Sequence, residues 1–142
     1  MKSVSSISYS SLGSEVYWKI VRANAKDAPS DDYLLENTED QIIEALESNV
    51  YLVKNGIIKG ASIDQGAYID ITKPLMLDIF KKLKLNYTEN EGISEQDLNE
   101  ADEIFVVNAV DGIRWVVGFE GKRYFNQTTR KINDLFINNL PN

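Results

Sequence analysis

The sequence has 142 residues, of which 43% are hydrophobic and 26% are charged, a composition typical of one globular domain. Its 15 basic and 22 acidic side chains give a formal net charge of −7, which disfavours binding to the phosphates of a nucleic acid. It contains no histidine and no cysteine, which excludes disulfides, thiolate or imidazole metal ligands and Ser-His-Asp triads. We predict no metal site, so carboxylates, lysine, tyrosine, the backbone or a bound organic cofactor must supply any chemistry.

The sequence also lacks the usual signals for membranes and secretion. Its longest apolar runs, 104–107 and 115–119, are far shorter than the roughly 20 residues that span a bilayer. The first nine residues carry one charge and no continuous apolar stretch of the kind that signal peptides have. We therefore expect no membrane association and a cytoplasmic location.

The chain begins with a Ser-rich leading segment, residues 1–13, and residues 14–142 are expected to form a single domain. The spacing of apolar residues predicts a helix over 14–27. Two hairpins are predicted next, the first over 33–44 with a polar turn at its centre. The second covers 50–58 and turns at Asn55-Gly56, a pair of residues that strongly favours a tight hairpin turn.

A helix is predicted after Thr72, which we expect to cap it, and its core face contains Leu75, Ile79 and Leu83. The sequence Ser94-Glu95-Gln96-Asp97 resembles a capping box and predicts a short helix that ends near residue 101.

The last third of the chain returns to strands and ends in a helix. Strands are predicted over 104–107 and 113–117, with a short third strand around 123–125. We expect Thr128 or Thr129 to cap the final helix, whose apolar stripe consists of Ile132, Leu135, Phe136 and Leu140. This order of elements predicts an α/β domain with mixed or mostly antiparallel strands.

Five segments stand in an order that is more specific than any one of them. They are Asp31–Asn37, Ile42–Ala45, Ser48–Gly56, Ile71–Lys73 and Ala101–Val116. Together they resemble the C-terminal domain of class IV (fold type IV) PLP-dependent aminotransferases, a family that includes branched-chain aminotransferases and aminodeoxychorismate lyases. The resemblance covers residues 14–136 and implies an α/β pseudo-barrel of mixed, mostly antiparallel strands with flanking helices.

The resemblance also implies a site for pyridoxal 5′-phosphate (PLP). Glu44 matches the family's glutamate, which pairs with the pyridine nitrogen and keeps it protonated as an electron sink. Ile71 and Thr72 match the turn that cradles the phosphate, where free N–H groups and a hydroxyl suit an anion. Asn108 and Ala109 match a second loop on the phosphate side, although the family often has a hydroxyl at the position of Ala109.

Each of these residues also has a plainer interpretation from the residue pattern alone. Glu44 would be a surface glutamate at the end of a strand, and Thr72 would be a simple N-cap. Asn108 and Ala109 would belong to an ordinary loop that ends a strand. Asn49 matches an asparagine at the head of a family strand and is expected to be structural.

The sequence departs from the family at the reactive lysine. The family's Schiff-base lysine would lie shortly before the helix expected at residue 14, and Lys2 is the only lysine that precedes Lys19. Lys2 is therefore the one candidate catalytic residue, although it stands earlier than the family's spacing to Glu44 would place it. Tyr9 is the candidate for the tyrosine that contacts the cofactor's phenolic oxygen.

The phosphate turn also departs from the family, because Asp70 stands where the family has glycine and Lys73 where it has arginine. A side chain at Asp70 would block or repel a phosphate.

The family's N-terminal domain has no counterpart in this sequence. We expect the cofactor-binding half of a PLP-dependent aminotransferase-like protein that acts on amino acids and 2-oxo acids and forms a homodimer. One alternative is a catalytically inactive homologue that keeps the fold as a binding or assembly module. Another is a binding module unrelated to the family. The discriminating feature is whether an amine reaches the cofactor, and the sequence does not distinguish transaminase from lyase chemistry.

Overall fold

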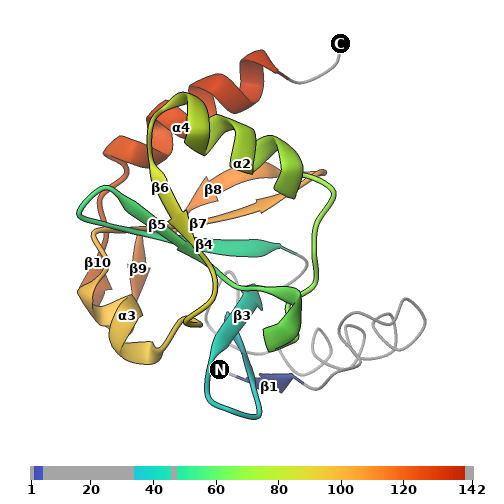
Figure 1. The fold of residues 1–142 in the computed structure, drawn as a ribbon. Coiled ribbons are helices and arrows are strands. Elements are labelled where there is room, and N and C mark those ends of the chain that lie inside the picture. Colours follow the sequence, from blue (N-terminus) through green and yellow to red (C-terminus); the bar gives the residue numbers. More distant parts are fainter. Residues whose placement is uncertain (1, 5–33, 46–47, 140–142) are drawn as a thin grey trace.

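The computed structural model describes residues 2–4, 34–45 and 48–139. Its largest sheet has the strand order β6-β5-β4-β7-β8, in which only β6 runs parallel to its neighbour. These strands are β4 (Asn49–Lys54), β5 (Ile57–Gly60), β6 (Asn86–Thr88), β7 (Glu103–Asn108) and β8 (Gly112–Trp115). The predicted α/β fold with mostly antiparallel strands is therefore confirmed (Figure 1).

A second sheet contains β1 (Lys2–Val4), β2 (Leu34–Asn37) and β3 (Ile42–Ala45), at the bottom of Figure 1. Strands β2 and β3 form the first predicted hairpin, and β4 and β5 form the second. Asn55 and Gly56 turn the second hairpin with φ angles of 50° and 76°, the left-handed conformation that this residue pair tolerates. Both predicted hairpins are confirmed.

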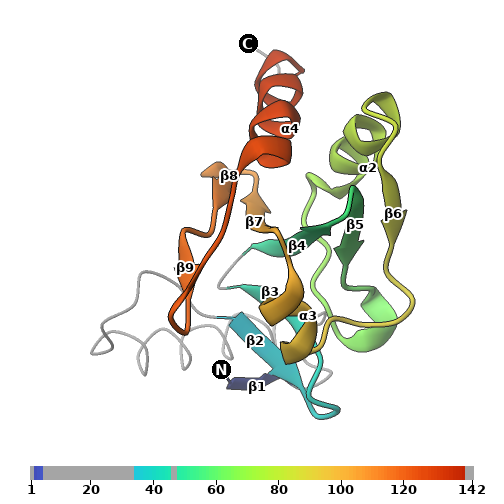
Figure 2. The same ribbon diagram turned by 90° about the vertical axis from the view of Figure 1, so that its left-hand side faces the viewer.

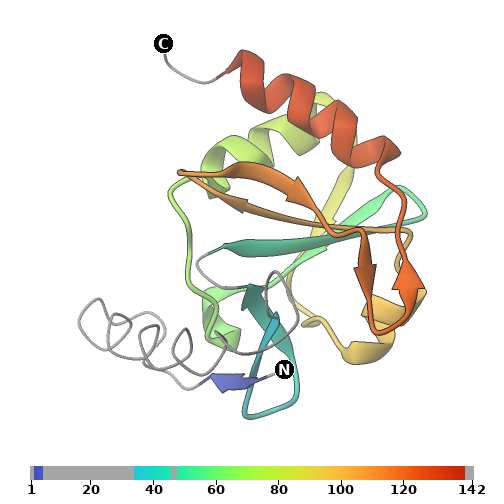
Figure 3. The same ribbon diagram turned by 180° about the vertical axis from the view of Figure 1, so that it is seen from behind.

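Two helices cover one face of the large sheet, and a third lies on the other side. Helices α2 (Lys73–Lys82) and α4 (Gln127–Asn138) contact each other and lie together at the top of Figures 1 and 2. Figure 3 shows α4 from behind, above β7 and β8. The short helix α3 (Glu95–Glu100) lies below the sheet, near the ribbon of β9 (Gly118–Phe119) and β10 (Lys122–Arg123).

Side-chain alternation along β4 and β7 separates two cores, because successive residues of a strand point to opposite faces. On the α2 and α4 face, Tyr51 and Phe105 stack with ring centroids 5.3 Å apart, and Phe80 of α2 packs edge-on against Tyr51. The other face carries a second cluster, which includes Leu52, Ile104, Leu98 of α3 and Ile42 of β3. Both strands are thus buried on both faces, and they fix the positions of the loops at their ends.

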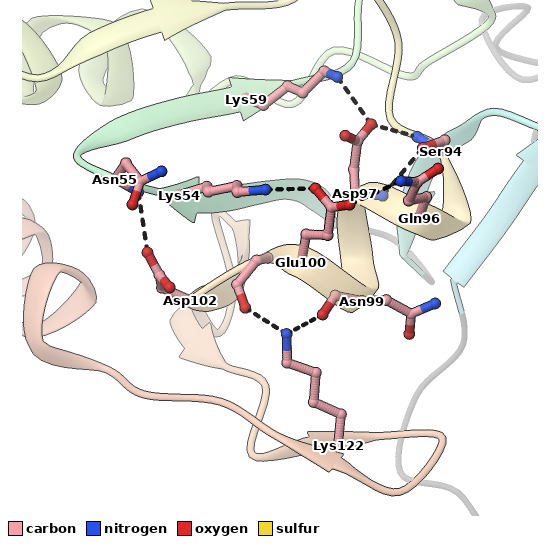
Figure 4. Close-up of polar contacts among 11 residues, drawn as sticks. Lys54, Asn55, Lys59, Ser94, Gln96, Asp97, Asn99, Glu100, Asp102 and Lys122 are labelled. Atoms are coloured by element: carbon pink, nitrogen blue, oxygen red, sulfur yellow. Dashed lines mark hydrogen bonds and ion pairs between the residues drawn. The ribbon is translucent and has the colours of Figure 1, made fainter.

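The capping box predicted for α3 is present. Ser94 Oγ accepts from the backbone N–H of Asp97 at 3.1 Å, and the Asp97 carboxylate accepts from the backbone N–H of Ser94 at 2.8 Å. Lys59 of β5 also contacts Asp97, at 2.9 Å, and Lys54 pairs with Glu100 at 2.5 Å (Figure 4). Lysine side chains therefore fasten α3 to the β4–β5 hairpin.

The core face predicted for α2 is confirmed, because Ile79 is fully buried and Leu75 and Leu83 pack, partly buried, against the same core. The helix also buries Met76 and Phe80. The third strand is only the two-residue β10, which ends before Tyr124.

The expected threonine cap of α4 was wrong. Asn126 occupies the N-cap position, and the hydroxyl of Thr129 instead donates to the buried carboxylate of Glu103 at 2.8 Å. The expected helix over 14–27 and Leu140 lie outside the described residues. None of the described helices is long and apolar enough to cross a membrane.

Candidate cofactor site

Glu44 is buried and does not lie at the surface. It sits on β3 opposite Leu35 of β2, its side chain is 0% exposed, and neither carboxylate oxygen has a hydrogen-bond partner among the described residues. Burial raises the pKa of Glu44 to about 8. The backbone of Tyr68, which lies close to the carboxyl group without the geometry of a full hydrogen bond, lowers the pKa by a smaller amount. The plain interpretation as a surface glutamate was therefore wrong. A buried polar group without a partner is unfavourable, so this carboxyl group suits a ligand that offers a hydrogen bond.

Asn49, the first residue of β4, holds the backbone segment that passes Glu44. Its side-chain Nδ2 donates to the carbonyl of Tyr68 at 2.5 Å, and its Oδ1 accepts from the backbone N–H of Asp70 at 3.0 Å. Residues 68–70 are thereby fixed between the head of β4 and the Glu44 carboxyl group. The structural role expected for Asn49 is consistent with these contacts.

In the turn that begins α2, the side chain of Asp70 binds the donors of Thr72. One oxygen of the buried Asp70 carboxylate, Oδ2, accepts from the backbone N–H of Thr72 at 2.9 Å and from the Thr72 hydroxyl at 2.5 Å. Thr72 occupies the N-cap position as expected, but its side chain makes no capping hydrogen bond to the helix. Ile71 between them is 78% exposed. The two Thr72 donors that the resemblance assigns to a phosphate are therefore bound to Asp70.

The cation of this turn is paired as well. Lys73 Nζ lies 2.7 Å from the carboxylate of Glu89, which also accepts from the hydroxyl of Tyr87 at 2.6 Å. The positive charge at the family's arginine position is thus already matched by a carboxylate.

The second loop is organised by Asn108, which is buried at the end of β7. Its Oδ1 accepts from the backbone N–H groups of Val110 and Asp111 at 2.9 and 2.6 Å, and its Nδ2 donates to the hydroxyl of Ser48 at 2.9 Å. Ala109 is exposed. The Asn108 side chain thus uses two of the loop's backbone donors for the loop itself.

The turn before α2 and the loop after β7 are both hydrogen-bonded to the neighbouring residues Ser48 and Asn49. Ser48 binds the Asn108 loop and Asn49 binds the Asp70 turn, because Asn49 faces Val107 across the β4–β7 ladder. The structure therefore brings together Glu44, the Thr72 turn and the Asn108 loop around the start of β4. Sequence reasoning did not single out Ser48, although its place beside Asn49 in a matched segment was an available signal.

Lys2 belongs to the same sheet as Glu44. β1 runs parallel to β2 with Lys2 beside Leu35, and Leu35 faces Glu44 on β3. Since neighbouring strands lie about 4.8 Å apart, the two backbones are separated by about 10 Å. The catalytic role of Lys2 stays a prediction, and Tyr9 lies outside the described residues.

Comparison with known proteins identifies the family and the fold of this chain. The family model for amino-transferase class IV matches residues 18–119. A Methanocaldococcus jannaschii protein that is named as a branched-chain-amino-acid aminotransferase is 24% identical over 121 residues, which are 82% of this chain and 42% of the relative.

Solved structures share the fold. The 4-amino-4-deoxychorismate lyase of Pseudomonas aeruginosa superposes with a TM-score of 0.80 at 21% identity, covering 88% of this chain and 46% of the lyase. An aminotransferase from Brucella abortus, bound to the cofactor PLP, gives 0.74 at 20% identity, covering 82% of this chain and 41% of that protein.

The chain belongs to the class IV aminotransferase family, as the family match over most of its length shows. It spans less than half the length of these relatives. The predicted fold, a fold type IV aminotransferase domain, is confirmed.

Proposed function

We propose that this chain is the cofactor-binding part of a PLP-dependent aminotransferase-like protein, in which Glu44 binds the pyridine nitrogen of the cofactor. The observation that carries the proposal is the fully buried Glu44 carboxyl group, which has no hydrogen-bond partner among the described residues. The Brucella abortus relative of the same fold is bound to PLP, which supports the choice of cofactor. When bound, PLP supplies an electron sink for negative charge that develops on an amino acid substrate.

The ring end of the site, by which we mean the surroundings of Glu44, fits this role. Because burial raises the pKa of Glu44 to about 8, its carboxyl group holds a proton at neutral pH and presents it at an oxygen atom in a dry environment. A pyridine nitrogen placed there would share that proton, and the resulting charged pair would satisfy both buried groups.

The phosphate end of the site, which consists of the Thr72 turn and the Asn108 loop, does not fit a phosphate group in the same way. The backbone N–H and hydroxyl of Thr72 both donate to Asp70, and Asn108 takes the N–H groups of Val110 and Asp111. The donors of Thr72, Val110 and Asp111 are therefore already used within the two loops.

The substrate and assembly belong to the same proposal. The related M. jannaschii protein is named for branched-chain amino acids and the P. aeruginosa protein for a lyase, so amino acids and their 2-oxo acids are the expected substrate class. We propose that the chain acts as a homodimer, with Lys2 as the reactive amine. It spans less than half of each relative, so its activity is proposed only together with the remaining part of the relatives' length.

One observation favours a second candidate, a catalytically inactive homologue that keeps the fold as a binding or assembly module. Asp70 closes the turn, and Glu89 matches the charge of Lys73. A protein that no longer loads a phosphorylated cofactor would tolerate both features.

Calorimetric titration with pyridoxine, which carries the pyridine ring but no aldehyde, tests the proposal. Replacing the Glu44 carboxyl group removes a hydrogen bond to a charged group, worth about 1.5–3 kcal/mol, so Glu44→Gln should weaken binding about ten- to a hundredfold. The exposed glutamate Glu39 supplies the matched control, and Glu39→Gln should bind as the unchanged chain does. Equal binding by both variants would contradict the assignment of Glu44.

A further inference from the structure

We infer that Asp70 is a built-in substitute for a ligand phosphate, so that this chain selects a pyridine-ring ligand that has no phosphate group. The inference rests on the proposed function, because it assumes that Glu44 binds the ring. It concerns the opposite end of the same site, where the residues of this chain differ from those that the resemblance implies.

The contacts of Asp70 are those that an anion would make. Its carboxylate is buried at 6% exposure and accepts two hydrogen bonds from Thr72, one from the backbone N–H and one from the hydroxyl. Its own backbone N–H is held by Asn49 at 3.0 Å. The carboxylate thus lies at the start of α2, where the helix dipole also favours negative charge.

The negative charge of Asp70 disfavours a ligand phosphate at the same donors. A phosphate monoester carries a charge of about −1.5 to −2 at neutral pH. It would have to enter beside the buried negative charge of Asp70, and the nearest cation in the turn, Lys73, is already paired with Glu89. A phosphate could therefore bind Thr72 only after Asp70 has moved away.

The second loop also uses two of its backbone donors internally. Its backbone N–H groups at Val110 and Asp111 donate to Asn108, and the Asp111 carboxylate lies within 3.1 Å of the same side chain. Ala109 has no hydroxyl to donate. A ligand phosphate would meet a carboxylate at each loop.

The ring end differs from the phosphate end in one decisive respect. Glu44 has no partner among the described residues, whereas the Thr72 donors are both used. The Glu44 carboxyl group is therefore left for a pyridine ring, whereas both Thr72 donors are occupied by Asp70.

The first test compares pyridoxine with pyridoxine 5′-phosphate by calorimetric titration of the whole chain. We expect the unchanged chain to bind pyridoxine at least as tightly as its 5′-phosphate. Asp70→Gly should free a charge-assisted hydrogen-bond site, so its affinity for the 5′-phosphate should rise about tenfold or more. The affinity for pyridoxine should stay within about threefold, because the ring contacts of Glu44 are unchanged. Asp70→Ala serves as a second variant if glycine unfolds the turn.

The exposed Asp102 supplies a matched control, because its carboxylate also accepts a backbone N–H in a turn, that of Asn55 at 3.0 Å (Figure 4). Asp102→Ala should leave the preference between the two ligands unchanged. If the unchanged chain prefers the 5′-phosphate, and both Asp70 variants keep the same preference, the inference about Asp70 is wrong while the proposed function stands.

A second test does not depend on ring binding. In amide NMR spectra with inorganic phosphate as the probe, the Thr72 N–H signal should stay fixed in the unchanged chain and shift saturably in Asp70→Gly or Asp70→Ala. A shift in the unchanged chain, or none in either variant, would overturn the inference. If phosphate behaves as expected but pyridoxine binds to no variant, the proposed function fails and the anion mimicry of Asp70 remains.

Discussion

Asn49 Oδ1 accepts a hydrogen bond from the backbone N–H of Asp70 at 3.0 Å, which joins the first residue of β4 to the turn that begins α2. The same amide donates to the carbonyl of Tyr68. A single side chain therefore fixes three successive residues between the buried Glu44 and the closed Thr72 turn.

Asn49→Ala should destabilise the domain by about 1–3 kcal/mol, because it leaves buried backbone groups without their partners. Urea unfolding followed by circular dichroism measures this change. The exposed Asn99, whose side chain makes no hydrogen bond within the described part of the chain, is the control, and Asn99→Ala should leave the midpoint nearly unchanged. Equal midpoints for the two variants would show that Asn49 does not hold the turn.

Glu44 should give the ligand-free domain a distinctive pH dependence. Its pKa rises from 4.5 to about 8 on folding, so between these values the folded state binds more protons than the unfolded state. Stability should therefore fall as pH rises through this window, by up to about 1.4 kcal/mol per pH unit from this group. Glu44→Gln should remove that part of the slope. Urea unfolding of both proteins between about pH 5 and pH 8 checks it, and parallel curves would refute the raised pKa.

The hydrogen bonds between Glu103 and the start of α4 should contribute to the stability of the domain. The buried Glu103 carboxylate accepts from the N–H of Thr128, the N–H of Thr129 and the Thr129 hydroxyl, at 2.8 to 2.9 Å. Glu103→Gln should cost about 1–3 kcal/mol because it removes a charged acceptor from the start of α4. The matched control is Glu100→Gln, on an exposed ion pair with Lys54, which should shift the unfolding midpoint little.

Lys2 can be tested by chemical trapping. After incubation with pyridoxal, which carries the aldehyde but no phosphate, and reduction with borohydride, peptide mapping should find added mass at Lys2, since a reachable lysine forms an imine with an aldehyde. Lys2→Ala should lose this adduct, and Lys131→Ala, on the exposed side of α4, should keep it. Adducts spread evenly over surface lysines would favour the inactive homologue.

The elements that the sequence predicted well are those with strong local signals. The Asn55-Gly56 turn needs left-handed backbone angles that few other pairs tolerate. The capping box over Ser94–Asp97 supplies hydrogen-bond partners for backbone N–H groups at the start of its own helix. The site residues could be proposed only through resemblance, since the pattern around Glu44 alone indicated a surface position.

Two contacts of threonine hydroxyls with buried carboxylates were harder to foresee. Both threonines were expected to cap helices, and only Thr72 occupies an N-cap position. The Thr72 hydroxyl donates to the buried carboxylate of Asp70, and the Thr129 hydroxyl donates to that of Glu103. The Glu103 contact joins residues 26 positions apart, so no local pattern could reveal it. The Asp70 contact spans only two positions, and the charge at Asp70 had indicated a conflict with phosphate without showing which donors it takes.

The nitrogen NMR signal of ¹⁵N-labelled pyridoxine bound to the chain tests the central claim most directly, because it reports the protonation of the ring nitrogen that Glu44 is proposed to bind. We predict a bound signal of the protonated ring at a pH where free pyridoxine is largely unprotonated, and loss of that protonated signal in Glu44→Gln. A bound signal that is the same in both proteins would contradict the account.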